Sequence, residues 1–370
     1  MKKSILSFGI AAALFSCSAP TDSDSNENNP EKMEEKNKDF KQGDESTYTQ
    51  REHLESASGH PVVFYNVENL FDIFDDPNTS DDEFTPQGRK KWDVTKYKKK
   101  IDDITKVLTS IGNEMPVIIG LSEVENADVV VDLLSHKDMR KGNYVIVHEE
   151  SPDNRGIDVA FMHDETRFNY LEHESIRTNF PWGSDIKTRD VLMVKGEFAN
   201  HDTVYIFVNH WPSRRDGQLE TEPKRTLVAQ NVRNRIDKIL EEDPEAKIML
   251  MGDFNDYPNN KSVSEVIKAK ETKDLKDGEF YNLMFRLEKQ GLGSHNYRGE
   301  WGMLDQIMIS KGLTNSKDGI KVRDNKAKVF AEDWVLFKRN TGETSPNKTY
   351  GGNKYFGGYS DHLPVYVILK

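Results

Sequence analysis

The sequence predicts an α/β protein in which helices cover the faces of β-sheets. Short buried apolar runs of strand length recur along the chain, from residues 62–65 to residues 365–369. Two longer segments instead repeat apolar residues at helical spacing. Because strands outnumber helices and the two kinds alternate, a layered α/β domain is favoured.

The individual elements follow from these patterns in chain order. The first helix is predicted at 94–108, where Ile101, Ile104 and Leu108 share one face, and the second at 223–241, where Val228 and Val232 do. The predicted strands are 62–65, 117–121, 158–162, 191–198, 203–208, 247–251, 304–309 and 365–369. No linker composition interrupts residues 59–370, so we expect one domain there.

The first 17 residues have the pattern of an export signal. Lys2 and Lys3 precede an apolar run over residues 5–15, which is too short for a permanent membrane span. Residues 14–17 resemble the lipobox of bacterial lipoproteins, which implies lipidation of Cys17 and anchoring to a bacterial membrane in the cell envelope. An ordinary signal peptide cut near Ala19 is the alternative.

Residues 18–58 form a second kind of segment, rich in Ser, Asn, Asp, Glu and Lys and poor in large apolar residues. Such a segment cannot bury enough apolar surface to offset its ordering entropy, so we expect a disordered acidic tether. The whole chain has a net charge of -12, which does not indicate a broad nucleic-acid-binding face. The single cysteine excludes an intramolecular disulfide.

Polar residues recur at the ends of the predicted strands. Polar groups placed there can converge on one rim of a sheet without being buried in its core. Five segments share this placement, and this recurrence predicts a site. The residues are Asn66, Glu123, Asn209, His210, Asp253, Asn255, Asp361 and His362.

These residue types fit the hydrolysis of a phosphoester. Carboxylate and amide oxygens, as on Glu123 and Asn66, suit Mg²⁺, with Mn²⁺ or Ca²⁺ as alternatives, and do not suit zinc. The metal ion would polarise a phosphoryl oxygen. His210 and His362 are candidates for acid and base, because an imidazole titrates near neutral pH. No Ser or Cys nucleophile motif is evident, so water is expected to attack phosphorus directly.

Six segments together resemble the successive motifs of the endonuclease/exonuclease/phosphatase superfamily, which is deoxyribonuclease I-like. They occur in the family's order over residues 62–366. Gly252-Asp253-Phe254-Asn255 and Ser360-Asp361-His362-Leu363-Pro364 are the most specific. The other four are Tyr65-Asn66-Val67-Glu68-Asn69, Leu121-Ser122-Glu123-Val124, Asn209-His210-Trp211-Pro212 and Leu304-Asp305-Gln306-Ile307.

The resemblance implies a four-layer α/β sandwich of two central mixed β-sheets flanked by helices. It also implies roles for the site residues. Asp253 and Asn255 would orient the attacking water and contact the phosphate. His362 would contact the scissile phosphate, and Asp305 would orient the His362 ring. His210 resembles the second histidine of the deoxyribonuclease I, inositol phosphatase and sphingomyelinase branches, which disfavours DNA repair. The implied metal-site residues are Asn66, Glu123 and Asp361.

Three arginines are candidate phosphate clamps, because a guanidinium can bind phosphate through two hydrogen bonds. They are Arg155, Arg214 and Arg215, and plain surface charge is the alternative for the last two. Asp158 stands in a segment where the family has a Gly-Val-Ala strand, and the sequence assigns it no role.

The functional hypothesis is a secreted metal-dependent phosphodiesterase, a nuclease acting on extracellular DNA or RNA, and we expect a monomer. A phosphatase or phosphodiesterase of small or lipid phosphoesters is the alternative, favoured by the acidic charge and by the lack of a basic stripe outside residues 96–100. An inactive binding module is the third, which the intact set of carboxylates and histidines disfavours. Substrate choice is expected to lie in the loops 72–93, 172–190 and 311–358.

Overall fold

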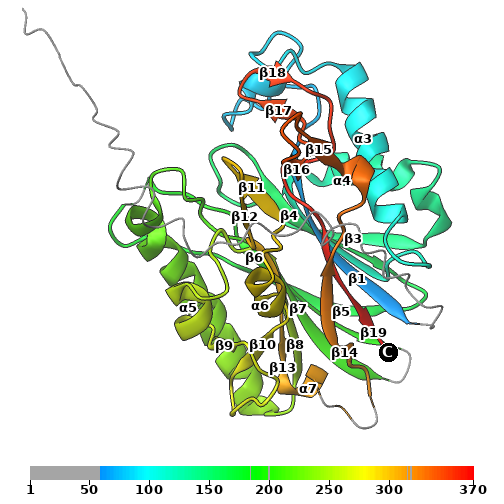
Figure 1. The fold of residues 1–370 in the computed structure, drawn as a ribbon. Helices are drawn as coiled ribbons and strands as arrows, with labels where there is room; N and C mark the ends of the chain where they lie inside the picture. The colour runs from blue at the N-terminus through cyan, green and yellow to red at the C-terminus, as the bar shows by residue number, and fades with distance from the viewer. Residues whose placement is uncertain (1–58, 184, 199–200, 315, 317–318) are drawn as a thin grey trace, which may run out of the picture. The chain divides into compact units, whose positions relative to one another are not determined.

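A computed structural model describes residues 59–183, 185–198, 201–314, 316 and 319–370. The predicted signal peptide, Cys17 and the tether over 18–58 lie outside the described residues. None of the helices in the described ranges is both long and apolar enough to cross a membrane. The described chain is built around two mixed β-sheets (Figure 1).

The first sheet of the described chain has six strands, in the order β14-β19-β1-β2-β4-β3. Its two central strands β1 and β2 are parallel, whereas the pairs on either side are antiparallel. The strand bounds are β1 His60–Leu70, β2 Ile118–Val124, β3 Tyr144–His148, β4 Asp158–Asp164, β14 Val322–Val329 and β19 Val365–Leu369.

The second sheet of the described chain has seven strands, in the order β5-β6-β7-β8-β13-β10-β9. Its centre repeats the plan of the first, because β7 and β8 form a parallel pair flanked by antiparallel strands, but at its edge β9 pairs with β10 in parallel. The bounds are β5 Asn169–Ile176, β6 Val191–Phe198, β7 Asp202–His210, β8 Lys247–Asp253, β9 Ala269–Lys270, β10 Phe280–Asn282 and β13 Asp305–Ser310.

Three apolar clusters show how the layers pack. One joins the inner faces of the two sheets, with Phe64 and Val208 among its members. A second packs the first sheet against α3 (Val94–Thr109) and α4 (Ala127–Ser135), and a third packs the second sheet against α5 (Gln218–Glu242) (Figure 1). The order helix, sheet, sheet, helix is the predicted four-layer sandwich, which is thereby confirmed.

Shorter elements connect these layers. They are the helices α6 (Phe285–Lys289) and α7 (Lys311–Thr314), the short helical turns η1 (Asp82–Phe84), η2 (Met139–Lys141), η3 (Ser262–Val266) and η4 (Asp333–Val335), and the strands β11 (His295–Tyr297), β12 (Glu300–Gly302), β15 (Leu336–Lys338), β16 (Thr344–Pro346), β17 (Tyr350–Gly351) and β18 (Lys354–Tyr355).

The predicted elements differ from the observed ones mainly at their ends and in the short pieces. The helix α3 matches its apolar pattern, and α5 begins five residues before the predicted start, with Pro223 near its beginning. The segments 172–190 and 311–358, predicted as loops, contain most of β5 and all of β14 to β18. β15 to β18 are only two or three residues long and pair in small hairpins, so they are too short for an alternating pattern to be recognised.

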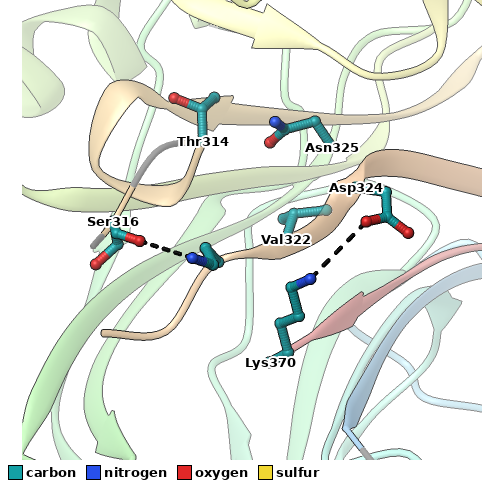
Figure 2. Close-up of a pocket in the computed structure, with 7 residues that line it drawn as sticks. Thr314, Ser316, Val322, Asp324, Asn325 and Lys370 are labelled. Carbon is teal, nitrogen blue, oxygen red and sulfur yellow. Dashed lines mark hydrogen bonds and ion pairs between the residues drawn. The ribbon is translucent and has the colours of Figure 1, made fainter. Parts of the chain in front are cut away.

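A surface pocket lies at the end of β19 that is remote from His362, because β19 runs from residue 365 to residue 369. Figure 2 shows Lys370 and Asp324 across it, joined by an ion pair of 3.8 Å. The residues that line it are Thr314, Ser316, Lys321, Val322, Asp324, Asn325 and Lys370. None of them is a predicted site residue.

Candidate active site

The two parallel strand pairs bring the predicted site residues to one rim of the sandwich. Asn66 and Glu123 lie near the carboxyl ends of β1 and β2, and His210 and Asp253 are the last residues of β7 and β8. In the second sheet His210 pairs in register with Asp253, which on its other side pairs with Asp305. The sequence predicted that most of these residues follow the strands. In the structure the strand pairing continues far enough to include them.

Asp253 is the centre of the cluster and is only 2% exposed. Its Oδ2 accepts a hydrogen bond of 3.1 Å from Asn66 Nδ2, and its Oδ1 accepts one of 2.9 Å from the Asn255 backbone N–H. The Nε2 atoms of His210 and His362 lie 3.7 Å and 3.9 Å from Asp253 Oδ2. One carboxylate oxygen is therefore approached from both sheets.

His362 is held in one orientation by two contacts. Its Nδ1 donates to Asp305 Oδ2 over 2.6 Å, which leaves Nε2 directed toward Asp253. Its backbone N–H donates to Ser360 Oγ over 3.0 Å, and that hydroxyl donates to the Asn66 carbonyl over 2.7 Å. The serine of the Ser-Asp-His motif therefore fastens the histidine segment to strand β1.

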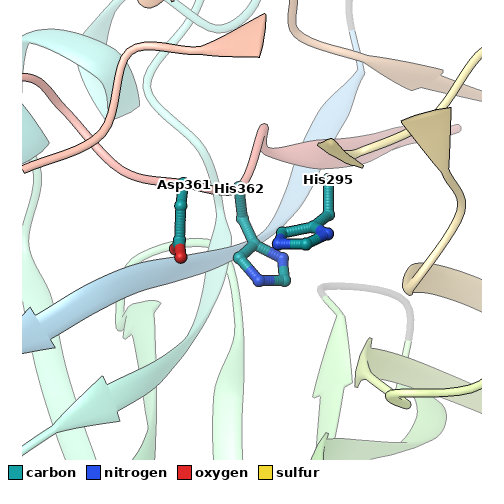
Figure 3. A group of neighbouring side chains, drawn as sticks. All are labelled: His295, Asp361 and His362. Carbon is teal, nitrogen blue, oxygen red and sulfur yellow. The ribbon is translucent and has the colours of Figure 1, made fainter. Parts of the chain in front are cut away.

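A third histidine, which the sequence did not single out, completes this side of the site. His295 on β11 forms an isolated backbone bridge with His362, and the centroids of the two rings are 4.7 Å apart. Figure 3 shows His295 beside His362, with Asp361 on the other side. One ligand atom from each of these residues lies within 4.8 Å of the others, so the three could share a metal ion. The hairpin of β11 and β12 places His295 beside His362. In the sequence His295 belongs to none of the family motifs, so the sequence did not indicate it.

The charged neighbours give the two predicted histidines opposite protonation. Burial lowers the pKa of His362, but Asp305, Asp253 and Asp361 outweigh it and raise the pKa well above its ordinary value. Burial lowers the pKa of His210 well below its ordinary value, and the charges of Arg189 and Arg155 lower it further. At neutral pH the metal-free site therefore holds an imidazolium at His362 and a neutral ring at His210.

Local backbone geometry supports this arrangement. Glu123 has φ +63°, a conformation that costs free energy in a residue with a long side chain, and its Oε2 accepts from the Asn69 N–H over 3.0 Å. Asn255 has φ +49°, which asparagine tolerates better. A Cβ at Gly252 would collide with the Asn209 backbone, so β7 and β8 can approach beside the site only with glycine there.

Buried negative charge makes the site suitable for a cation. Burial and the charge of Asp361 raise the pKa of Glu68 to about 7, and burial above all raises the pKa of Asp253 to about 7. The buried Lys100 lies close enough to Glu68, Asp361 and Glu123 for their charges to raise its pKa, although burial lowers it more. One ammonium group cannot neutralise this set, so a divalent cation fits the residues present. Asp361 offers it an oxygen beside His295 and His362, and the ligand role of Glu123 stays a prediction.

Contacts within the protein occupy the side chains of Asn66, a predicted metal-site residue, and of its neighbour Glu68. The Asn66 Oδ1 accepts from the Glu68 backbone N–H over 3.0 Å, so both ends of the amide already have partners within the protein. The Asn66 ligand role therefore stays a prediction. Glu68 accepts from the backbone N–H groups of Thr349 and Tyr350 over 2.6 Å and 3.0 Å and so anchors the 349–350 segment.

Arg189 is a further site residue that the sequence did not indicate. It is buried and donates to Asp153 over 3.0 Å and to the Trp211 carbonyl over 2.6 Å. The same carbonyl accepts from Asn255 Nδ2 over 3.0 Å. Arg189 thus links the residue after His210 to the 151–157 segment, a connection that is visible only in three dimensions.

The three predicted phosphate clamps differ in how free they are. Arg155 is half-buried, pairs with Asp153 over 3.6 Å and is close enough to His210 to lower its pKa. Arg215 is exposed. Arg214 instead turns inward, where it donates to the Asn255 carbonyl over 2.6 Å and to Asp256 over 3.0 Å. Most of its donors are occupied, so Arg155 has the best placement for a phosphate of the three.

The comparisons with known proteins agree with this geometry. A model of the Endonuclease/Exonuclease/phosphatase family matches residues 61–370. The chain therefore belongs to this family of phosphoric ester hydrolases, whose members typically depend on divalent metal ions. No curated protein shows a significant match to the chain.

Solved structures of low sequence identity share the fold. TDP2 from D. rerio, complexed with a single-strand DNA product, is 17% identical with a TM-score of 0.51, and the match covers 85% of this chain and 100% of that one. The human Nocturnin catalytic domain with bound sulfate is 15% identical with a TM-score of 0.51, covering 84% and 94%. A family protein from Bacteroides thetaiotaomicron is 14% identical with a TM-score of 0.51, covering 84% and 95%.

Proposed function

We propose that the chain is a Mg²⁺-dependent phosphodiesterase of the cell envelope that hydrolyses extracellular nucleic acid. The observation that carries the proposal is the convergence of two histidines and Asn66 on one oxygen of Asp253, at 3.1–3.9 Å. A similar fold in TDP2 from D. rerio, solved with a single-strand DNA product, supports the choice of substrate class.

The chain's own residues account for the chemistry. Asp253 and Asn255 hold the attacking water, and Asp253 accepts its proton as the new P–O bond forms and the ester bond breaks. The leaving oxygen keeps the electron pair of the broken bond and takes a proton from solvent. His362, charged and fixed by Asp305, donates a hydrogen bond to a phosphoryl oxygen where negative charge develops. A cation held by Glu123 and Asp361 would act as a Lewis acid on the same group.

A small or lipid phosphoester is the second candidate substrate, and one observation favours it. The basic run over residues 96–100 does not form an open face for a nucleic acid backbone. Lys100 is buried and donates to Thr349 and Tyr359, and Lys99 pairs with Asp103 over 2.6 Å. Little of this positive charge is therefore free to contact phosphates, on which nucleic-acid affinity normally depends.

A substrate panel separates these candidates. The protein is incubated with plasmid DNA, RNA, bis-p-nitrophenyl phosphate and p-nitrophenyl phosphate, each with Mg²⁺ or with EDTA. We expect Mg²⁺-dependent cleavage of the nucleic acids and the diester, with little release from the monoester. Activity that survives EDTA would rule out the metal dependence, and release from the monoester alone would rule out the diesterase.

The envelope location rests on the N-terminal sequence. Cys17→Ala should release the protein from the membrane fraction, because a lipid chain attached at Cys17 would be the main membrane-binding group. The distribution between membrane and soluble fractions measures this, with Ser18→Ala as the neighbouring control. Equal membrane retention of Cys17→Ala and the parent would contradict lipidation.

A further inference from the structure

A second group of potential metal ligands lies at the edge of the first sheet, outside the residues of the active site. His148 is the last residue of β3, Asp158 is the first residue of β4, and Glu150 follows in the loop between them (Figure 1). One ligand atom from each lies within 4.8 Å of the other two. The Asp158 side chain is 1% exposed and that of His148 is 5% exposed, whereas Glu150 is exposed.

Two buried atoms of this group have no hydrogen-bond partner among the described residues. Asp158 Oδ1 accepts from the Ser151 backbone N–H over 2.8 Å and from its hydroxyl. Asp158 Oδ2 and His148 Nε2, by contrast, have no such partner and form an ion pair with each other over 3.3 Å. Buried polar atoms without a hydrogen bond require an explanation, and a cation held between the imidazole and the carboxylates is one.

The spacing and the atom types agree with a transition metal. Zinc with bonds of about 2.0–2.1 Å in tetrahedral geometry holds neighbouring ligand atoms about 3.3–3.4 Å apart. The separation of 3.3 Å between His148 Nε2 and Asp158 Oδ2 matches that value.

We propose that His148, Glu150 and Asp158 bind a divalent transition metal of the zinc class, separate from the cation of the active site. An imidazole nitrogen with two carboxylates favours zinc over Mg²⁺ or Ca²⁺, which take oxygen ligands. The exposed Glu150 side chain closes the remaining gap by rotation, and water completes the coordination. The proposal does not depend on the substrate proposed above.

Such an ion would fix the loop between β3 and β4, which supports the active site. Asp153 in this loop pairs with Arg189 over 3.0 Å, and Arg189 holds the Trp211 carbonyl beside His210. The Asn154 carbonyl accepts from the Ser80 N–H over 2.7 Å, which ties the loop to the acidic 72–83 segment. The loop also carries Arg155, so metal binding would order a candidate phosphate contact.

The test measures zinc binding to the full chain with Cys17→Ala, which removes the only thiol. Zn²⁺ is titrated in competition with a chromophoric chelator in excess Mg²⁺, and an equivalent bound at His295, Asp361 and His362 would be common to all variants. We expect a further tight Zn²⁺ equivalent that Glu150→Gln or Asp158→Asn weakens by roughly tenfold to a hundredfold or more, the loss that even an outer-shell mutation causes. Zn²⁺ should also raise the melting temperature of the parent more than that of Asp158→Asn.

Glu149→Gln is the matched control, because Glu149 is adjacent and exposed but pairs with His173 over 3.0 Å. It should bind Zn²⁺ like the parent. If Asp158→Asn does not fold, the exposed Glu150→Gln provides the same comparison. Equal Zn²⁺ affinity in Glu150→Gln, Glu149→Gln and the parent would overturn the proposal, as would no binding by the parent.

Discussion

The surroundings of His210 and of His362 differ in their balance of charge, although the two rings are similarly buried. Their Nε2 atoms lie at almost equal distances from Asp253 Oδ2, 3.7 Å and 3.9 Å, and that of His210 also lies 3.8 Å from Glu123 Oε1. The charges of Asp305 and Asp361 raise the pKa of His362, whereas burial and the charges of Arg189 and Arg155 lower that of His210. Burial is common to both, so the neighbouring charges decide which ring holds a proton.

Removing the charged ring should have the largest effect. We expect His362→Ala to lower kcat by roughly 10²–10³, the range for a lost donor to the charge that develops in the transition state, measured with bis-p-nitrophenyl phosphate. His201→Ala is the control, because that side chain is 90% exposed and should leave kcat unchanged. A near-normal rate in His362→Ala would refute its assignment.

Neutralising the partner of His362 should have an intermediate effect. The raised pKa keeps His362 charged through neutral pH, and the charge is lost only when the pH rises through that pKa. Asp305→Asn removes a negative charge that raises the pKa, so His362 should lose its proton at a lower pH. We expect a rate loss of roughly 10–100-fold, typical of an orienting partner. NMR titration of the metal-free protein should show a lower pKa for His362 than in the parent. An unchanged pKa would mean that Asp305 is not the dominant charge.

Neutralising a guanidinium near His210 should have the smallest effect. Arg155→Gln should raise the pKa of His210 toward its ordinary value, because one of the charges that lowers it is removed. We expect KM to increase about tenfold or less, equivalent to about 1.4 kcal/mol, from the lost phosphate contact. Arg140→Gln, which changes an exposed arginine, is the control. Equal KM values for Arg155→Gln and Arg140→Gln would contradict a role of Arg155 in substrate binding.

The sequence by itself determined the layered α/β class, the helix α3 and the identity of most residues on the rim. It could do so because apolar periodicity and a motif such as Gly252-Asp253-Phe254-Asn255 are local properties of the chain. The resemblance to the family added the order of the layers and the orienting role of Asp305 toward His362, whose side chains lie 2.6 Å apart in the structure.

Only the tertiary structure decided which other groups surround these residues. His295, Arg189 and Lys100 lie far from the motifs along the chain, and a hairpin, a strand end and a helix bring them to the site. Their effect is electrostatic, and a charge acts over distance in space without regard to separation in sequence. For the same reason the sequence presented Asp158 as an unexplained residue, and the fold placed it against His148 and Glu150.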